Sequence, residues 1–394
     1  MVANSEKLAV NGGKQVRNSL LTYGKQWIDD EDIHEVIETL KSDWITTGPK
    51  INDFEAKLCE YVGCKYAVVV NSGTSALDIA VQSLRLPKGG EVITTPFTFV
   101  ASSNALLYNG LIPVFTDISY DTRNIDTVLI RNKITKNTKA ILFVDYAGHP
   151  CEIDELKEIA DEYDLFLIED ACHSLGACYR NKKVGNITDL TIFSFHPVKH
   201  ITTGEGGAVV LNNKDLFDSL ARLRTHGIDR NALSRYGPDA SWAYDMKDLG
   251  RNYRMTDFQA ALGISQLKKL DMFIGKRKSL ANRYMADLKN LPWISLPTTS
   301  PYVKHSWHIF TILLNKKISR DAFFKYMRSA NIGVNVHYIP IYKHSYYLNN
   351  FPVRIEDFPV TEDVFSRIIT IPLHPKITNE EFDYIVNTIT DYNW

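Results

Sequence analysis

Lys199 is the residue whose setting most strongly suggests chemistry. It lies in a segment rich in glycine, threonine and aromatic residues, between two apolar runs at residues 190–195 and 208–211. Lysines usually extend into solvent, so this setting is unusual. An amine that is removed from water can become a nucleophile toward carbonyl carbons. The segment does not match the Walker phosphate-binding pattern, because no Gly-Lys-Ser/Thr triplet follows a glycine at the required spacing.

Two acidic residues, Glu169 and Asp170, directly follow the apolar run at residues 165–168. A carboxylate in this position requires a cation or a hydrogen-bond donor, because burying an unpaired charge is costly. A protonated pyridine nitrogen would be such a cation, but capping of the following helix explains the same residues equally well. His173, three residues on, could contact the same ligand or could be an ordinary core histidine.

A possible phosphate-binding segment, Asn-Ser-Gly-Thr-Ser at residues 71–75, follows the apolar run at residues 66–70. Small residues that open a helix leave free N–H groups, and these groups bind phosphate together with the helix dipole. Taken alone, the segment is an ordinary helix cap. Ser194, near the end of the run at residues 190–195, is a further hydroxyl at a strand end.

The order of the elements explains how these segments could meet. Short apolar runs alternate with helical patterns over the first two-thirds of the chain. We expect strands at residues 66–70, 91–94, 112–115, 140–144, 165–168, 190–195 and 208–211, and helices at 74–84, 99–108 and 151–163. Strands without polar alternation that are separated by helices indicate a largely parallel sheet buried on both faces. Ligands bind beyond the carboxyl ends of such strands.

The pattern changes near Asp257, where apolar residues recur at helical spacing and indicate one long helix leading out of the first domain. Beyond it we expect a strand at residues 307–313 and helices at 320–329 and 379–389. The chain therefore divides into a large α/β domain with an N-terminal arm, residues 1–262, and a smaller α+β domain, residues 263–394. Residues 229–244 are expected to form a surface loop.

The composition excludes several classes of function. The chain has 394 residues and a formal net charge of −1, so no general attraction to nucleic acid or anionic membranes is expected. No run approaches the roughly 20 apolar residues that span a bilayer, and residues 1–19 do not resemble a signal peptide. The 5 cysteines follow no zinc spacing, and scattered thiols fit a reducing cytoplasm. No pair of the 11 histidines shows metal-ligand spacing on one element.

Taken together, the motifs resemble the fold-type I pyridoxal 5'-phosphate (PLP) enzymes, and more narrowly the DegT/DnrJ/EryC1/StrS sugar aminotransferase family. The resemblance covers nearly the whole chain, from about residue 21 to 393. The motifs that carry it lie, in order, at residues 72–77, 98–101, 169–176, 193–199, 204–207 and 252–257. The family fold is aspartate aminotransferase-like, with a mostly parallel central sheet.

The resemblance also implies roles for individual residues. Lys199 would form a Schiff base with PLP, and Asp170 would pair with the pyridine nitrogen, keeping it protonated. The other implied cofactor contacts are Phe99, which would stack on the ring, His173, and Thr74, Ser75 and Ser194 at the phosphate. Either Asn252 or Arg254 would complete the phosphate site of the neighbouring subunit in a homodimer. The substrate-side candidates are His196, His337 and Tyr338, each of which could instead be structural.

Several stretches resemble the aminotransferases of pseudaminic acid biosynthesis, namely residues 23–26, 42–49, 147–151 and 337–340. Those enzymes aminate C4 of a UDP-linked 2-acetamido-2,6-dideoxy-4-hexulose, and the family resemblance implies glutamate as the amino donor. The alternative within the family is another nucleotide-linked 4-keto-6-deoxy sugar, of the perosamine or 4-amino-arabinose type. A PLP sugar dehydratase would carry a histidine in place of Lys199. A non-catalytic homologue would lack Lys199 or Asp170, and both are present.

Overall fold

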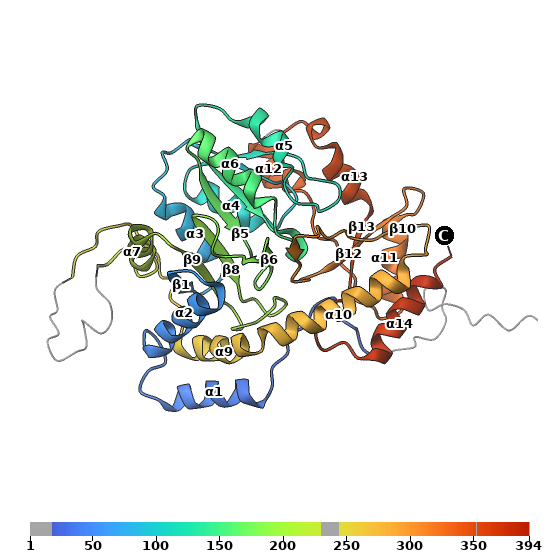
Figure 1. Ribbon diagram of the computed structural model, residues 1–394, viewed down its shortest axis with the longest axis horizontal. Coiled ribbons are helices and arrows are strands. Elements are labelled where there is room, and N and C mark those ends of the chain that lie inside the picture. Colours follow the sequence, from blue (N-terminus) through green and yellow to red (C-terminus); the bar gives the residue numbers. More distant parts are fainter. Residues whose placement is uncertain (1–17, 230–243, 352, 394) are drawn as a thin grey trace, which may run out of the picture.

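The computed structural model describes residues 18–229, 244–351 and 353–393. Within these ranges, seven strands form one central sheet in the order β1-β9-β8-β5-β4-β2-β3 (Figure 1). Their bounds are β1 Tyr66–Val70, β2 Glu91–Thr94, β3 Ile112–Phe115, β4 Thr138–Val144, β5 Phe166–Asp170, β8 Leu190–Ser194 and β9 Gly207–Leu211. The four neighbouring pairs from β8 to β3 are parallel, whereas β9 is antiparallel to both β1 and β8. The expected largely parallel sheet is confirmed.

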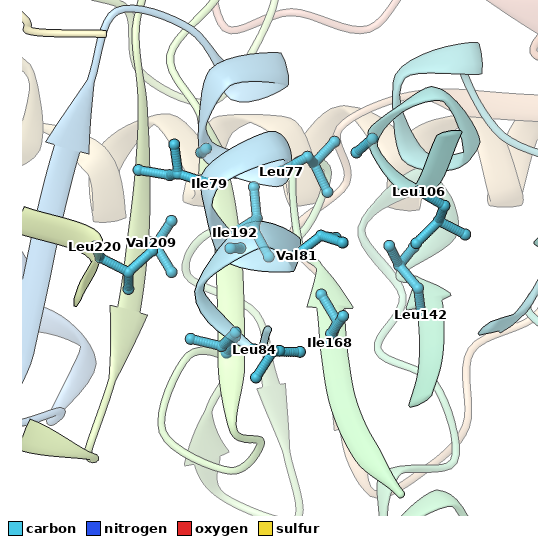
Figure 2. Packing of buried hydrophobic residues seen from close by; sticks show 14 of the residues in the cluster. Leu77, Ile79, Val81, Leu84, Leu106, Leu142, Ile168, Ile192, Val209 and Leu220 are labelled. Carbon is cyan, nitrogen blue, oxygen red and sulfur yellow. The ribbon is translucent and has the colours of Figure 1, made fainter. Parts of the chain in front are cut away.

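Helices cover both faces of this sheet, because successive strand residues point to opposite sides. Val68 packs on one face with α3 (Gly73–Ser83), α4 (Val100–Tyr108) and α7 (Lys214–Leu223). Figure 2 shows this layer, with Ile168, Ile192 and Val209 of the sheet against leucine, isoleucine and valine side chains of the helices. Val69 points to the other face, which is covered by α2 (Pro49–Val62) and α9 (Asp257–Lys268) beside β1, and by α6 (Ile153–Tyr163) beside β4.

A second, smaller core lies in the C-terminal part of the chain. Its sheet has the order β10-β12-β13, formed by Ile294–Ser295, Phe310–Leu314 and Ile368–Ile371. The helices α11 (Arg320–Ser329) and α14 (Asn379–Thr390) pack against it together with the second half of α10 (Leu270–Leu288). We call this part of the structure the small region. The N-terminal Leu21 is buried in the same core.

The expected single long helix from Asp257 is two successive helices, α9 and α10 (Figure 1). Lys269 separates them, and its ammonium contacts Asp29 and Asp32 at the start of α1 (Asp30–Lys41) at 2.6 and 2.8 Å. Along α10, Phe273 packs with the sheet core and Tyr284 packs with the small region. The division between residues 262 and 263 stays a prediction.

The remaining elements connect these layers. They are α5 (Thr127–Ile130), α12 (Ser345–Asn350), α13 (Pro359–Arg367), and the strands β6 (Cys178–Tyr179), β7 (Lys182–Lys183) and β11 (Val303–Lys304), which form a third sheet. The expected surface loop at residues 229–244 lies, apart from its two ends, outside the described residues. In the described ranges, no helix has both the length and the apolar character needed to cross a membrane.

Candidate active site

A cavity of about 530 Å³ opens at the carboxyl ends of β1, β5 and β8. Nine of the twelve predicted site residues line it: Thr74, Phe99, Asp170, His173, Ser194, His196, Lys199, His337 and Tyr338. The sheet and its loops supply one wall, and the segment from Asn335 to Tyr338 supplies the other. Residues more than 260 positions apart in the sequence therefore meet at one edge of the sheet.

Asp170 ends β5 with its side chain directed into the cavity and almost fully buried. One carboxylate oxygen accepts a hydrogen bond from the Ser102 hydroxyl at 2.7 Å, and the other accepts from the Cys172 backbone N–H at 3.2 Å. Both donors are neutral, so these bonds orient the carboxylate and leave its charge available. Ser102 was not predicted from the sequence, although it directly follows the motif at residues 98–101.

Lys199 lies in the turn after β8, where its backbone N–H donates to the His196 carbonyl at 2.9 Å. Its side chain lines the cavity that Asp170 enters. Loss of solvent lowers the pKa of Lys199, because burial disfavours the charged amine. The nearby Cys172 and Asp170 act in the opposite direction, and Arg277 adds to the decrease. Lys199 is therefore a partly buried amine in the cavity wall rather than a solvated surface charge.

The first turn of α3 lines one part of the cavity. Ser72 caps the helix by accepting from the Ser75 backbone N–H at 3.0 Å. The following Gly73 lets Ser194 approach the helix start closely, because a methyl group at its Cα would lie 2.9 Å from Cβ and 3.1 Å from Oγ of Ser194. The exposed Thr74 lines the same part of the cavity. A helix start with free N–H groups beside the hydroxyls of Thr74 and Ser194 is suited to a phosphate group.

His173 and Tyr338 join the two walls of the cavity. The Tyr338 hydroxyl and His173 Nε2 are 2.9 Å apart, and their rings stack at 5.9 Å. Nδ1 of His173 has no hydrogen-bond partner among the described residues, although it is buried. Burial lowers the pKa of His173 well below its usual range, so the ring is neutral. A neutral imidazole with a free nitrogen can donate to or accept from a ligand in the cavity.

His337, like Tyr338, is held in place by a hydrogen bond and by a neighbouring ring. Its Nδ1 lies 2.8 Å from the Thr370 hydroxyl, and burial lowers its pKa to about 3. Its ring packs edge-on against Tyr23 at 5.1 Å. By contrast, His196 is exposed at the mouth of the cavity. Tyr23 and Asn335 also line the site and were not predicted as site residues. Tyr23 lies in the stretch at residues 23–26 that carries part of the resemblance, but no role was implied for it, and no motif or periodicity marks Asn335.

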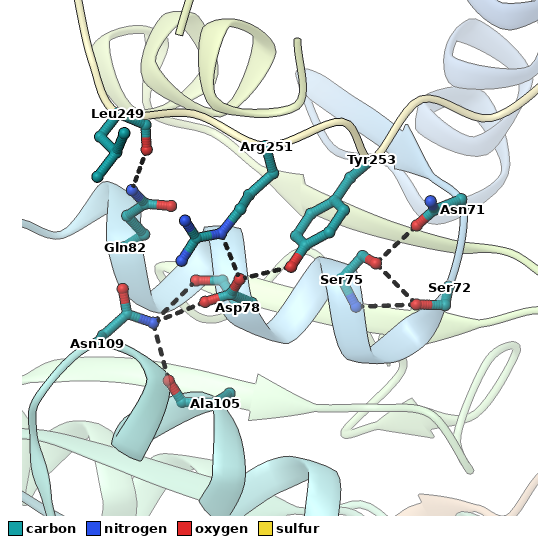
Figure 3. A network of polar contacts seen from close by, with 10 residues as sticks. All are labelled: Asn71, Ser72, Ser75, Asp78, Gln82, Ala105, Asn109, Leu249, Arg251 and Tyr253. Carbon is teal, nitrogen blue, oxygen red and sulfur yellow. Dashed lines mark hydrogen bonds and ion pairs between the residues drawn. The ribbon is translucent and has the colours of Figure 1, made fainter. Parts of the chain in front are cut away.

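Three predicted residues do not line the cavity: Ser75, Asn252 and Arg254. The Ser75 hydroxyl is engaged in the helix cap, donating to Asn71 at 2.6 Å. Asn252 is exposed and forms an isolated bridge with Thr225. Figure 3 shows how the segment around Asn252 is held on α3, where Arg251 and Tyr253 both contact the Asp78 carboxylate, at 3.2 and 2.9 Å.

The residues present fit PLP. The carboxylate of Asp170, bonded only to neutral donors, offers its charge to a pyridine nitrogen. The amine of Lys199 lines the same cavity, and the start of α3 beside the Ser194 hydroxyl offers hydrogen-bond donors to a phosphate. The ring of Phe99 is 58% exposed at the cavity, which leaves its face open to a second ring. The described residues contain no cluster of histidine, cysteine and acidic side chains able to hold a metal ion.

Comparison with known proteins gives consistent matches over nearly the whole chain. A model of the DegT/DnrJ/EryC1/StrS aminotransferase family matches residues 26–390. A UDP-4-amino-4,6-dideoxy-N-acetyl-β-L-altrosamine transaminase from Campylobacter jejuni is 40% identical over 376 residues, which are 94% of this chain and 96% of that protein. Helicobacter pylori PseC, an aminotransferase involved in the biosynthesis of pseudoaminic acid, has a TM-score of 0.89 and 34% identity, covering 94% and 98% of the two chains. Spr1654 from Streptococcus pneumoniae, solved in its PLP form, has a TM-score of 0.87 and 30% identity, covering 94% and 97%.

Proposed function

Because the chain belongs to the DegT/DnrJ/EryC1/StrS aminotransferase family, we propose that it transfers an amino group to C4 of a UDP-linked 2-acetamido-2,6-dideoxy-4-hexulose. The observation that carries the proposal is one cavity that holds Lys199, Asp170 and the start of α3. The sugar is proposed from the similarity to the Campylobacter jejuni transaminase and to PseC. We further propose glutamate as the donor, a homodimer as the working form, and the cytoplasm as its location.

PLP, when bound, supplies an electron sink for the charge that is left when a proton leaves the donor's α-carbon. Asp170 would hold the pyridine nitrogen in its protonated form, because an adjacent negative charge raises the pKa of a base. Ser102 and the Cys172 N–H keep the carboxylate aimed into the cavity. These contacts fix the orientation of Asp170 before any ligand binds.

Lys199 would hold the cofactor covalently and then, as a free amine, move a proton between the donor and the cofactor. An amine can accept a proton only in its uncharged form, and the lowered pKa of Lys199 favours that form. At the other end, Gly73, Thr74 and Ser194 would hold the phosphate, so that the ring stays in place while bonds change. Phe99 would cover one face of the ring.

The substrate side of the cavity is formed by His196, His337 and Tyr338, which would contact the sugar. His337 is neutral and fixed by Thr370, so it would present a constant hydrogen-bonding face. His196 at the mouth is free to meet the bulkier nucleotide portion. The remote nucleotide would supply binding energy that orients C4 of the sugar toward Lys199.

A substrate panel tests the proposed reaction. The protein is incubated with PLP, glutamate and UDP-, GDP- or dTDP-linked 4-keto-6-deoxy sugars, and mass spectrometry identifies which sugar gains nitrogen. We expect amination of the UDP-linked 2-acetamido sugar at least tenfold faster than of the others, because pocket contacts of this kind discriminate by about 1–3 kcal/mol. Faster amination of a GDP or dTDP sugar would replace the substrate assignment, and no amination of any sugar would reject it.

The role of Lys199 is tested with Lys199→Arg. We expect the variant to fold, to show no visible absorption band of lysine-bound PLP, and to lose at least 10³-fold in turnover, in line with loss of a covalent catalyst. Lys276→Arg is the control, because Lys276 is exposed on α10 and lies over the Trp27 ring. A normal band in Lys199→Arg would exclude Lys199 as the attachment point.

A further inference from the structure

Arg277 is a fully buried arginine at the centre of α10, only 1% exposed. Its Nη1 donates to the carbonyl oxygens of Leu373 at 2.8 Å, His308 at 2.9 Å and Trp307 at 3.4 Å. Its Nη2 donates to the carbonyl oxygen of Lys199 at 3.4 Å. Each of these acceptors is a neutral backbone group. A buried guanidinium that is held by carbonyls rather than by a carboxylate keeps an uncompensated positive charge.

The position of Arg277 connects two parts of the protein. Phe273, one turn earlier on α10, packs in the sheet core, and Leu280, one turn later, packs in the small region. The four carbonyls come from three segments: the Lys199 turn, the approach to β12, and the residues after β13. One side chain therefore joins the turn that carries Lys199 to the part of the chain that forms the opposite wall of the cavity.

The positive charge of Arg277 affects the pKa of Lys199 as well. Burial lowers the pKa of Arg277 to about 10, so the guanidinium is still protonated at neutral pH. Its charge contributes to the lowered pKa of Lys199, after loss of solvent. The other titratable groups that face Lys199 are Asp170 and Cys172, which favour its charged form, and His173, His200, His308 and His337, whose pKa values are all lowered.

We propose that Arg277 is a positioning residue for Lys199, which ties the lysine turn to the small region and places a fixed positive charge that favours the neutral amine. Two consequences follow for the reaction. The lysine backbone cannot move independently of the opposite cavity wall, and the amine is ready to act as a base when it is released. The proposal rests on the proposed role of Lys199 as the reactive amine.

The effect of the Arg277 charge on Lys199 is tested on the apo-protein, in the absence of PLP and of both substrates. Acetylation of Lys199 by acetic anhydride is followed against pH by peptide mass spectrometry, with exposed lysines as internal references. In Arg277→Gln we expect the apparent pKa of Lys199 to rise, so that its acetylation at neutral pH slows by about tenfold for each pH unit of the shift. Arg277→Lys keeps the charge and is expected to restore acetylation to within about twofold of the wild type. Unchanged Lys199 reactivity in folded Arg277→Gln would overturn the charge assignment.

Two further variants keep the test decisive. Arg367→Gln is the control, because Arg367 is also buried but pairs with Asp363, and it should leave Lys199 reactivity unchanged. If Arg277→Gln does not fold, Arg277→Met replaces the buried cation with an apolar side chain of similar length and gives the same comparison.

The tether is tested by hydrogen exchange of the amides at residues 196–203. Lysine at position 277 cannot bond to all four carbonyls. In Arg277→Lys we therefore expect the amides of residues 196–203 to exchange at least tenfold faster than in the wild type, because this segment loses local stability. Wild-type protection in Arg277→Lys would overturn the tether. Acetylation and hydrogen exchange do not depend on bound PLP, whereas the absorption band of Lys199→Arg does. A failure of the proposed function can therefore be told apart from a failure of the role proposed for Arg277.

Discussion

At the scale of single residues, the two adjacent carboxyl groups at the end of β5 face different surroundings, one the cavity and the other the interior of the sheet. Asp170 enters the cavity, whereas Glu169 is buried in the sheet and accepts from the Thr191 hydroxyl at 2.8 Å. Burial, reinforced by the charge of Asp145, raises the pKa of Glu169 well above its usual range. Burial also raises the pKa of Asp145 to about 6. Near neutral pH this pair therefore retains a proton, and Asp145 in turn accepts from the Ser174 hydroxyl at 2.6 Å, next to His173.

Glu169→Gln should make stability less sensitive to pH, because glutamine mimics the protonated acid. In the wild type, the folded state holds a proton that the unfolded chain releases above its ordinary pKa, near 4. The free energy of unfolding contributed by this pair therefore falls as the pH rises through about 4 to 6 and beyond. We expect the variant to gain on the order of 1 kcal/mol relative to the wild type between about pH 5 and pH 8, measured by urea unfolding.

The exposed Asp161 provides the control for this measurement, since Asp161→Asn should leave the pH dependence unchanged. If the stability of Glu169→Gln relative to the wild type is constant or falls with rising pH, then Glu169 and Asp145 do not retain a proton in the folded state.

At the scale of elements, the seven strands of the main sheet could be predicted to within two residues because they are buried on both faces. Continuous apolar runs such as Tyr66–Val70 carry that information directly. Since ligands bind beyond strand ends, the positions of Asp170, Ser194 and Lys199 followed from the same runs. The break at Lys269 between α9 and α10 could not be predicted, because it involves contacts with α1, more than 230 residues earlier in the chain.

The opposite wall of the cavity was less accessible to sequence reasoning. Asn335 and Tyr338 lie on irregular backbone between α11 and α12, where no periodic pattern exists to place a side chain. Tyr23 comes from the N-terminal segment and meets His337 only after folding. Resemblance to a family supplied His337 and Tyr338 as candidates, whereas residue chemistry alone did not.

The first turn of α3 gives a prediction at this scale. Gly73→Ala would place a methyl group 2.9 Å from Ser194 Cβ, so either Ser194 or the helix start must move. Overpacking of this kind costs about 1–3 kcal/mol, and we expect PLP to bind the apo-protein at least tenfold more weakly. Absorbance titration with PLP measures the change. Gly275→Ala on the exposed side of α10, where nothing lies within 4 Å of the new methyl, should bind PLP normally; equal affinities of the two variants would contradict a phosphate site at Gly73.

At the scale of the whole molecule, the segment that carries Asn252 and Arg254 lies outside the cavity of its own chain. It is nevertheless fixed in place, because Asp78 of α3 holds Arg251 and Tyr253 on either side of Asn252 (Figure 3). The backbone carbonyl of Tyr253 also accepts from the backbone N–H of Asn71, directly before the first turn of α3. A rigid, partly exposed segment beside the site of its own chain is suited to reach the equivalent site of a second copy.

A mixing experiment tests whether the working site is shared between subunits. Lys199→Arg is combined, by co-expression with separate tags, with Asn252→Ala or with Arg254→Ala, and the doubly tagged heterodimer is assayed for amination. If Asn252 or Arg254 serves the partner's site, each heterodimer has one site with both defects and one site with none. Random assembly gives half heterodimers, so an unfractionated mixture should recover roughly a quarter of the wild-type sites.

Because only the residue that crosses to the partner can be complemented, the same experiment distinguishes Asn252 from Arg254. Activity should return with one of the two alanine variants, and that variant alone must be strongly defective as a homodimer. Lys199→Arg mixed with Asp170→Asn is the control, because both residues line one cavity of one chain, and each site of that heterodimer keeps one defect. Recovery in this control would mean that Lys199 and Asp170 act in different subunits, which their common cavity contradicts. No recovery with either alanine variant would show that neither Asn252 nor Arg254 completes the partner's site.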